Sequence, residues 1–210
     1  MKLYQSNTSP HSRRIRIYLA EKGISMPLVP VDLGLGEQFS ESYAAINPRR
    51  VVPTLVLDDG TAIGEVPAII RYLEEIHPVP PLLGSAPRSK ALVTMWERRA
   101  EQEGFASAME AVRNAAPRLE GRAIAGPHDY EQIPALVERS RRRVANFHAD
   151  FDARLAAVPF VASDEFSIAD ITTVATVDFA ARAAGLLIPS ECVSLQRWYD
   201  KVAVRPSMAA

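Results

Sequence analysis

Residues 52–67 read Val52-Pro53-Thr54-Leu55-Val56-Leu57-Asp58-Asp59-Gly60-Thr61-Ala62-Ile63-Gly64-Glu65-Val66-Pro67, and this stretch decides how the first part of the chain folds. Its two apolar runs, 54–57 and 61–63, flank Asp59-Gly60, a pair typical of the tight turn between antiparallel strands. Pro67 then stands where a helix would begin, ahead of apolar residues spaced for one helical face. The stretch therefore predicts a β-hairpin that leads directly into a helix.

The residues before this stretch predict a strand, a helix and a second strand. A short strand at Leu3-Tyr4 is followed by a polar loop and by a helix that ends at Gly23, a residue type that closes helices. Residues 26–32 are apolar but contain Pro27 and Pro30. Because proline cannot donate a hydrogen bond within a sheet, this strand is expected at an edge. The predicted order is β-α-β, a loop segment, and β-β-α.

The composition changes at residues 77–81, His-Pro-Val-Pro-Pro, which cannot continue a helix and predict a linker. Beyond it strand signals nearly vanish, and apolar periodicity predicts four helices, at 89–115, 136–157, 168–184 and 190–204. Ser167 and Asp170 have the spacing of a capping box at the start of the third helix. We therefore expect a small α/β domain at 1–78 and an all-helical domain at 87–210.

The overall composition excludes several classes of function. The 210 residues include 24 basic and 25 acidic side chains, a balance that gives no field to attract nucleic acid or an anionic membrane. The one cysteine, Cys192, excludes an internal disulfide framework, and the histidines lack the spacing of a metal site. No run is long and apolar enough for a secretory signal or a membrane span. We expect a soluble protein of a reducing compartment without a metal.

Several short motifs occur in a fixed order along the chain. They are Ser9-Pro10, Arg13-Arg14-Ile15-Arg16, Ala20-Glu21-Lys22, Gly36-Glu37-Gln38, Val52-Pro53, Glu65-Val66-Pro67 and Phe166-Ser167-Ile168-Ala169-Asp170-Ile171. With these motifs the chain resembles the cytosolic glutathione transferases over essentially its whole length. Within that family it is similar to a fungal and bacterial subgroup with an atypical active-site loop.

This resemblance implies a fold, an activity and partners. The fold would be a thioredoxin-like domain at 1–78 that binds glutathione, followed by the all-helical domain at 87–210, which contributes the electrophile site. The activity would be conjugation of the glutathione thiolate to a small apolar electrophile, as in detoxification. Glutathione would be a co-substrate, with no further cofactor. The resemblance also implies a cytoplasmic homodimer that binds neither nucleic acid nor a membrane.

The resemblance assigns the central glutathione contacts to two neighbouring motifs. Val52 before a cis Pro53 would pair its backbone with the cysteine portion of the tripeptide; a simple proline at the start of a strand is the alternative. Glu65 would receive the ligand's ammonium group. Val66 departs from the Glu-Ser pair common in the family, so its backbone amide at the helix start would bind the γ-glutamyl carboxylate.

Two further residues match positions near the glycine end of glutathione in related transferases. They are Gln38 and Arg50, and an arginine suits a terminal carboxylate. Lysine is common in the family at the position of Val51, so this chain departs from the pattern there as well. The alternative for Arg50 is an ordinary surface arginine.

Activation of the thiol requires that the protein favour its anion, because a free cysteine-like thiol has a pKa of about 8.5. In the family this task falls to a hydroxyl or thiol in the loop before the first helix, and here Ser9 is the first candidate. Ser9 and Ser12 are alternatively helix-capping residues. Asn114, near the end of the first long helix, is a second candidate by resemblance, with an ordinary helix-end role as its alternative.

The electrophile pocket would lie between the two domains. Its candidate residues are His11, Trp96 and Arg113. The alternative for His11 is an ordinary exposed loop histidine, and core packing competes strongly for Trp96. Two other functions stay open. One is a glutathione-binding regulatory or scaffold protein without transferase activity, since Val66 lacks the family's hydroxyl. The other is a glutathione-dependent peroxidase, in which the thiolate attacks a peroxide, although no cysteine stands in the loop.

Overall fold

The computed structural model describes all 210 residues and begins with a small mixed sheet. Its strands are β1 (Lys2–Gln5), β2 (Leu28–Pro30), β3 (Thr54–Val56) and β4 (Ala62–Ile63), in the order β2-β1-β3-β4. β1 runs parallel to β2 and antiparallel to β3, and β3 and β4 form the predicted hairpin. The proline-containing strand β2 lies at an edge, which confirms the prediction.

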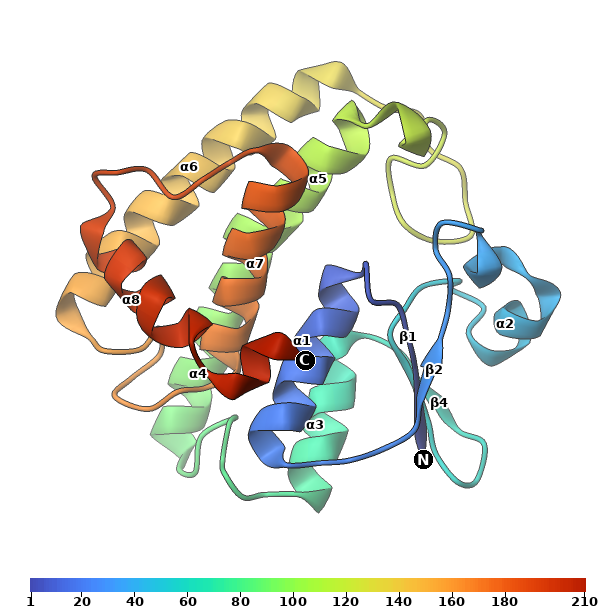
Figure 1. Ribbon diagram of the computed structural model, residues 1–210, viewed down its shortest axis with the longest axis horizontal. Helices are drawn as coiled ribbons and strands as arrows, with labels where there is room; N and C mark the ends of the chain where they lie inside the picture. The colour runs from blue at the N-terminus through green and yellow to red at the C-terminus, as the bar shows by residue number, and fades with distance from the viewer.

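Three helices cover the sheet. α1 (Pro10–Lys22) and α3 (Val66–Ile76) pack against each other on one face, and the short α2 (Glu41–Ile46), which follows the 3-10 turn Glu37–Phe39, lies on the other side (Figure 1). Gly23 ends α1 in the left-handed conformation, with φ of 64°. These elements make the thioredoxin-like part of the fold.

The linker after α3 is held by a buried ionic cluster. The ammonium group of Lys22 lies 2.7 Å from the Glu74 carboxylate and donates to the backbone oxygens of His77, at 2.7 Å, and of Pro80. Glu74 also accepts hydrogen bonds from the Tyr18 hydroxyl at 2.6 Å and the Leu83 amide at 3.1 Å. A linker that the sequence predicts only as a helix stop is therefore tied closely to α1 and α3.

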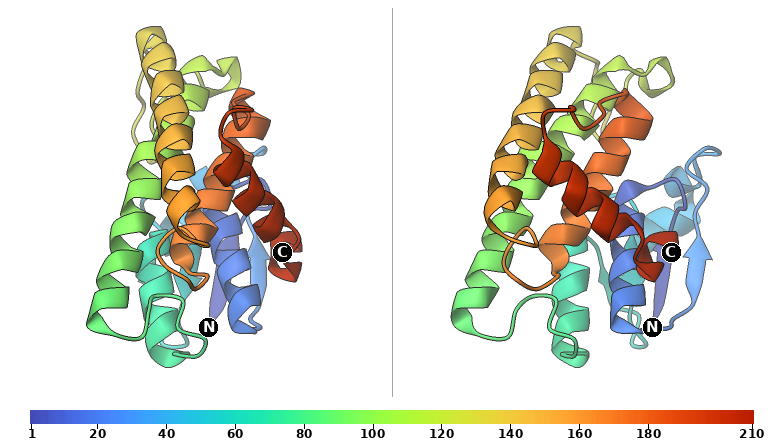
Figure 2. Two further views of the ribbon diagram at one scale, coloured as in Figure 1. Left: turned by 90° about the vertical axis from the view of Figure 1, so that its left-hand side faces the viewer. Right: turned by 60° about the vertical axis from the view of Figure 1, so that its left-hand side comes forward.

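The remainder of the chain is helical. Its helices are α4 (Pro87–Arg99), α5 (Ala106–Ala115), α6 (Pro134–Ala157), α7 (Ile168–Ala184) and α8 (Val193–Ala203), with 3-10 turns at Pro117–Leu119 and Pro206–Ala209. α7 lies between the outer helices α5 and α6 and the first helix α1 (Figure 2). None of these helices has the length and apolarity that crossing a membrane would require.

The sequence predicts one uninterrupted helix at 89–115, and this detail is wrong. A π-helical segment, Ala100–Phe105, separates α4 from α5. Gly104 within it packs so closely that a Cβ atom there would lie 2.8 Å from side-chain atoms of Phe147 and Thr176. A π segment adds a residue to the turn and rotates the following side chains, and such segments recur at functional sites. Periodicity alone does not reveal it, since the apolar spacing on either side is helical.

The capping box of α7 is confirmed. The Asp170 carboxylate accepts hydrogen bonds from the Ser167 amide at 3.0 Å, the Val161 amide at 2.9 Å and the Trp198 indole at 3.0 Å. The Ser167 hydroxyl oxygen accepts from the Ala169 amide at 3.3 Å. Complete burial raises the pKa of Asp170 to about 6, against the pull of these donors.

One apolar core runs through both parts of the chain. It contains 28 buried residues and extends from Leu3 and Ile15 in the α/β part to Phe151 and Trp198 in the helical part. The division into domains at 1–78 and 87–210 stays a prediction, since the two parts share this core.

A buried ion pair joins α1 to α4. The Arg14 guanidinium, which has no exposed surface, lies 2.7 Å from a carboxylate oxygen of Glu97 and 3.3 Å from one of Glu101. Burial raises the pKa of Glu97 and the charge of Arg14 opposes that rise. A second pair, Arg13 with Asp178 at 2.5 Å, joins α1 to α7. The start of α1 is therefore fixed against the helical part by charge as well as by apolar contact.

Replacing Arg14 with Met is expected to lower the free energy of unfolding by about 3–5 kcal/mol, because Glu97 is left buried without its partner. The double replacement Arg14→Met with Glu97→Gln should recover much of that loss, since no buried charge is then unpaired. Urea denaturation of both variants measures the difference. A single variant as stable as the double one would contradict this account.

Candidate functional site

The turn before β3 is held by one backbone oxygen. The carbonyl of Val51 accepts hydrogen bonds from the Tyr43 hydroxyl at 2.6 Å, the Asn47 amide at 3.0 Å and the Thr54 hydroxyl at 3.3 Å. Arg50, just before it, has φ of 54°, in the left-handed region that non-glycine residues rarely adopt. The polar side chains of α2 and β3 thus determine the path of this turn.

The turn leaves the backbone of Val52 open. The Val52–Pro53 peptide bond is cis, as the resemblance implies. Val52 is only 7% exposed, yet its amide and carbonyl form no backbone hydrogen bond outside the helices and strands, and it belongs to no strand. An open donor and acceptor in the extended backbone just ahead of β3 are groups that can pair with an extended peptide.

The start of α3 supplies one further open donor, the amide of Val66. Glu65, at its N-cap, has φ of 65°, and its carbonyl accepts from the amides of Ala68 at 3.1 Å and Ile69 at 3.0 Å. Val66 is the first helical residue, and its amide forms no backbone bond. Pro67 has no amide hydrogen. A positive φ at a residue such as glutamate is found mainly where function requires it, and a helix N-terminus favours an anion.

These two features lie close together. Gly64, directly before the N-cap of α3, sits within 3.8 Å of the Asn47 side-chain amide, measured from the position a Cβ would take. Asn47 in turn holds the Val51 carbonyl. Asn47 therefore links the turn that precedes Val52 to the residue that precedes the N-cap of α3.

The loop before α1 is occupied by capping bonds. The Ser9 hydroxyl oxygen accepts from the Ser12 amide at 3.2 Å, and the Ser12 hydroxyl oxygen accepts from the Ser6 amide at 3.2 Å. The capping role of Ser9 is thus confirmed. A hydroxyl group that accepts one bond keeps its own hydrogen, so this role leaves Ser9 able to donate to a ligand. Its role in catalysis stays a prediction.

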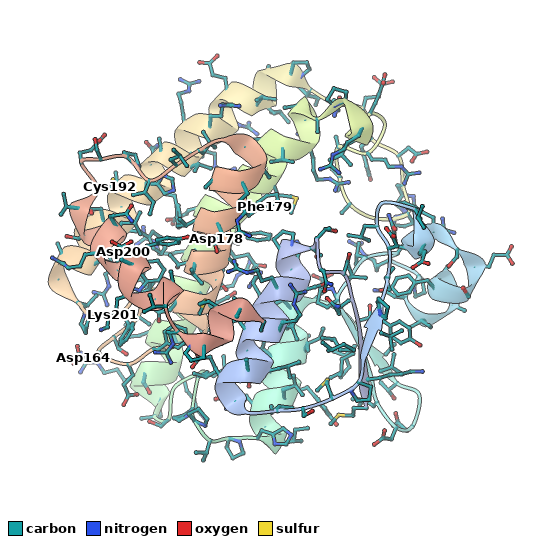
Figure 3. The ribbon with its side chains drawn as sticks, viewed as in Figure 1. Asp164, Asp178, Phe179, Cys192, Asp200 and Lys201 are labelled. Atoms are coloured by element: carbon teal, nitrogen blue, oxygen red, sulfur yellow. The ribbon has the colours of Figure 1, made fainter.

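His11 begins a row of aromatic rings that crosses from α1 to the helical part. Its ring centroid lies 4.6 Å from that of Phe105, and Phe105 stacks on Phe179 of α7 at 5.9 Å. Burial, then the charges of Arg14 and Arg113, lower the pKa of His11 to about 3. Figure 3 shows Phe179 and its neighbour Asp178 on the stretch of α7 nearest to the start of α1. The row therefore presents neutral, apolar rings beside the loop of Ser9.

Sequence reasoning missed Phe105 and Phe179. Each lies in an apolar helical stretch in which a phenylalanine reads as ordinary core, and Phe105 owes its orientation to the π segment that it ends. A signal was available in Gly104, because a glycine inside a predicted helix often marks a close approach or an irregular turn.

Two other predicted residues hold structure together in the helical part. Asn114 accepts from the Ile133 amide at 2.8 Å and donates to the Glu110 carbonyl at 2.9 Å, so its amide fastens the loop before α6 to α5. Trp96 packs at 5.6 Å against Phe151, with Arg99 and Arg154 over its ring at 4.6 Å each. These contacts favour the alternative roles, at a helix end and in the core.

The predicted residues for the glycine end are Gln38, which lies ahead of α2, and Arg50, which lies in the turn itself. Gln38 is part of the 3-10 turn Glu37–Phe39, and its buried side-chain oxygen has no hydrogen-bond partner. The Arg50 side chain is half-buried and forms no ion pair. The unpartnered amide oxygen of Gln38 is buried, whereas the unpaired cation of Arg50 is partly exposed.

The two described cavities lie elsewhere. One of about 320 Å³ is bounded by Lys22, Met26 and His77 at the end of α1, and one of about 250 Å³ lies between α6 and α8 beside Trp198. No group of three or more histidine, cysteine or acidic residues is arranged to hold a metal ion.

Comparison with known proteins identifies relatives over the whole chain. Residues 3–81 match the family model of the glutathione S-transferase N-terminal domain, and residues 134–201 match that of the C-terminal domain. Glutathione S-transferase 2 of Saccharomyces cerevisiae is 36% identical over 211 residues, which covers 99% of this chain and 88% of that protein.

Solved structures agree with the sequence comparison. The crystal structure of Gtt2 from Saccharomyces cerevisiae superposes with a TM-score of 0.90 at 34% identity, covering 100% of this chain and 99% of that one. A glutathione S-transferase domain-containing protein from Marinobacter aquaeolei VT8 gives 0.88 at 34% identity, covering 99% and 100%.

The low pKa of His11 predicts a pH dependence of stability. Its pKa falls from 6.5 to about 3 on folding, so between these values the unfolded chain binds a proton that the folded protein does not. This residue therefore contributes a loss of stability as the pH falls from about 6.5 toward about 3. His11→Gln should flatten that fall, measured as unfolding free energies in urea at neutral and at mildly acidic pH. Parallel pH profiles for the two proteins would exclude this role.

Proposed function

The chain belongs to the glutathione S-transferase family and is a glutathione S-transferase, and on this premise we propose that it conjugates the thiolate of glutathione to small apolar electrophiles. The observation that carries the proposal is the open backbone of Val52 next to the open amide of Val66. An open backbone segment ahead of β3, together with a helix N-terminus, suits a short peptide that carries a carboxylate.

In this proposal glutathione lies along the turn and the start of α3. The cysteine portion pairs with the backbone of Val52, the γ-glutamyl carboxylate accepts from the Val66 amide, and the ammonium group meets the exposed carboxylate of Glu65. Gln38 and Arg50 stand toward the glycine end. This chain lacks the hydroxyl that is common in the family at position 66. That absence is compatible with the arrangement, because the amide donor belongs to the backbone.

The sulfur is held at the start of α1. The positive end of the helix dipole and the free hydrogen of the Ser9 hydroxyl both favour the thiolate over the thiol. Lowering the thiol pKa by two units, from about 8.5, needs about 2.7 kcal/mol of differential stabilisation. Because the thiolate is the nucleophile, most of the catalysis comes from this stabilisation and from positioning.

The electrophile binds against the partly exposed rings of His11 and Phe179, and the buried ring of Phe105 packs against both of them. His11 is neutral over the physiological range because of its low pKa, so the two exposed rings offer an apolar surface. We propose that glutathione is the co-substrate and that no metal or other cofactor takes part.

The cellular setting belongs to the same proposal. We expect a cytoplasmic homodimer with a role in detoxification, on the basis of the family resemblance. Light scattering would then give a particle of twice the 23.0 kDa of one chain.

Ser9→Gly is expected to lower kcat/KM for a generic aryl halide about 100-fold, because it removes a hydroxyl donor to the sulfur while glycine still tolerates the N-cap position. Ser9→Thr keeps a hydroxyl and should retain most of the activity. Steady-state conjugation rates, with glutathione near saturation, provide the measurement. Full activity in Ser9→Gly would show that backbone amides and other polar groups, and not the Ser9 hydroxyl, stabilise the thiolate.

Isothermal titration calorimetry with reduced glutathione tests binding itself. Glu65→Gln should weaken binding about tenfold, because the carboxylate that meets the ammonium group is lost. Glu75→Gln, at an exposed position farther along α3, is the matched control and should bind normally. The absence of binding heat with the intact protein would reject the proposed site. Binding without conjugation would instead favour the glutathione-binding scaffold.

A further inference from the structure

The loop between α5 and α6 has a defined shape of its own. Arg122 and Tyr130 form an isolated β-bridge, in which the Ala123 amide donates to the Tyr130 carbonyl at 3.0 Å and the Tyr130 amide donates to the Gly121 carbonyl at 2.8 Å. These bonds close residues 121–130 into a small ring of backbone, which we call the bridging loop. Its conformation is therefore set by the chain itself.

The side chains of α5 and the residues next to the loop anchor its base. Arg113 donates to the carbonyl of Arg122 at 2.6 Å and to that of Ala123 at 3.3 Å. Gln132 donates to the carbonyls of Arg113 at 2.7 Å and Ala116 at 2.8 Å. Arg113, a candidate for the electrophile pocket, therefore uses its guanidinium N–H groups to hold the backbone of Arg122 in place.

The bridging loop reaches across to the α/β part. The guanidinium carbon of Arg122 lies 3.9 Å from the centroid of the Phe39 ring, and the Cβ position of Gly126 lies 3.9 Å from the Arg49 carbonyl oxygen. Figure 1 shows this loop beside α5, extending toward the segment that carries α2. The helical part therefore contacts the α/β part at Phe39, the residue next to Gln38, where the glycine end of glutathione is expected.

The charge at this contact is uncompensated. The half-buried guanidinium of Arg122 forms no hydrogen bond and no ion pair, and the same holds for the side chains of Arg49, Arg50 and Arg118. Arg122 and Arg118 are near enough to Arg113 to help burial lower its pKa. A cation stacked on an aromatic ring keeps its outward donors free and loses little freedom when it binds an anion.

We propose that Arg122 binds the glycine carboxylate of glutathione, so that the tripeptide is held from both parts of the chain. This inference rests on the proposed function and adds a specificity residue from the helical part. Arg122 suits the role better than Arg118, which is exposed on the 3-10 turn and has no stacking partner. A guanidinium and a carboxylate match in a two-bond, planar arrangement.

The test compares two ligands that differ only in the charge at the glycine end. Glutathione and its glycine carboxamide are titrated by calorimetry into the full-length protein and into Arg122→Ala. We expect Arg122→Ala to weaken glutathione about tenfold and the carboxamide less than about twofold, because only glutathione carries the carboxylate that Arg122 receives. Arg118→Ala, which removes the same charge four residues away, should bind both ligands as the unchanged protein does.

Three results would overturn the inference. They are undiminished glutathione affinity in Arg122→Ala, an equal loss for both ligands, and an equal loss in Arg118→Ala. Arg122→Lys, which keeps the charge, should retain part of the affinity, and a common thermal unfolding midpoint shows that the variants are folded. If the unchanged protein bound neither ligand, the proposed function would fail with it, whereas binding that ignores Arg122 would reject this inference alone.

Discussion

The structure depends on the buried ion pair between Arg14 and Glu97. Arg14 lies in the first turns of α1, close after Ser9 and His11, and Glu97 lies just before the π segment that ends at Phe105. The pair therefore fixes the position of the loop before α1 relative to the aromatic row. A buried charge pair tolerates little displacement, because any separation leaves two charges in an apolar surrounding. The ion pair therefore favours one arrangement of the two parts of the chain, whereas apolar contacts alone permit many arrangements of nearly equal energy.

The groups proposed to receive glutathione are mainly backbone groups. The Val52 amide and carbonyl and the Val66 amide are open, and side chains elsewhere keep them so. Tyr43, Asn47 and Thr54 act by donating hydrogen bonds to the Val51 carbonyl. This division explains how the chain departs from the family at Val66 and still presents a donor there. The residue type at a contact matters less than the path of the backbone that carries it.

The bridging loop gives the site a second connection between the two parts. The Arg14 guanidinium is buried and paired with Glu97, whereas the Arg122 guanidinium is stacked on Phe39 and has no ionic partner. The first therefore contributes to the position of α1, and the second is available to a ligand. The helical part thus contacts the α/β part through α1 at one end and through the neighbourhood of Gln38 at the other.

The amino-acid sequence alone determined the hairpin at Asp59-Gly60, the edge strand, the helix end at Gly23 and the capping box of Ser167 and Asp170, because each depends on neighbours within a few residues. It also indicated the family, through motifs whose order is visible without a structure. Only the tertiary structure decided the π segment, the aromatic row from His11 to Phe179, the pair of Arg14 and Glu97, and the contact of Arg122 with Phe39. These features join residues that are distant in the chain, and local propensity carries no information about which distant side chains will meet.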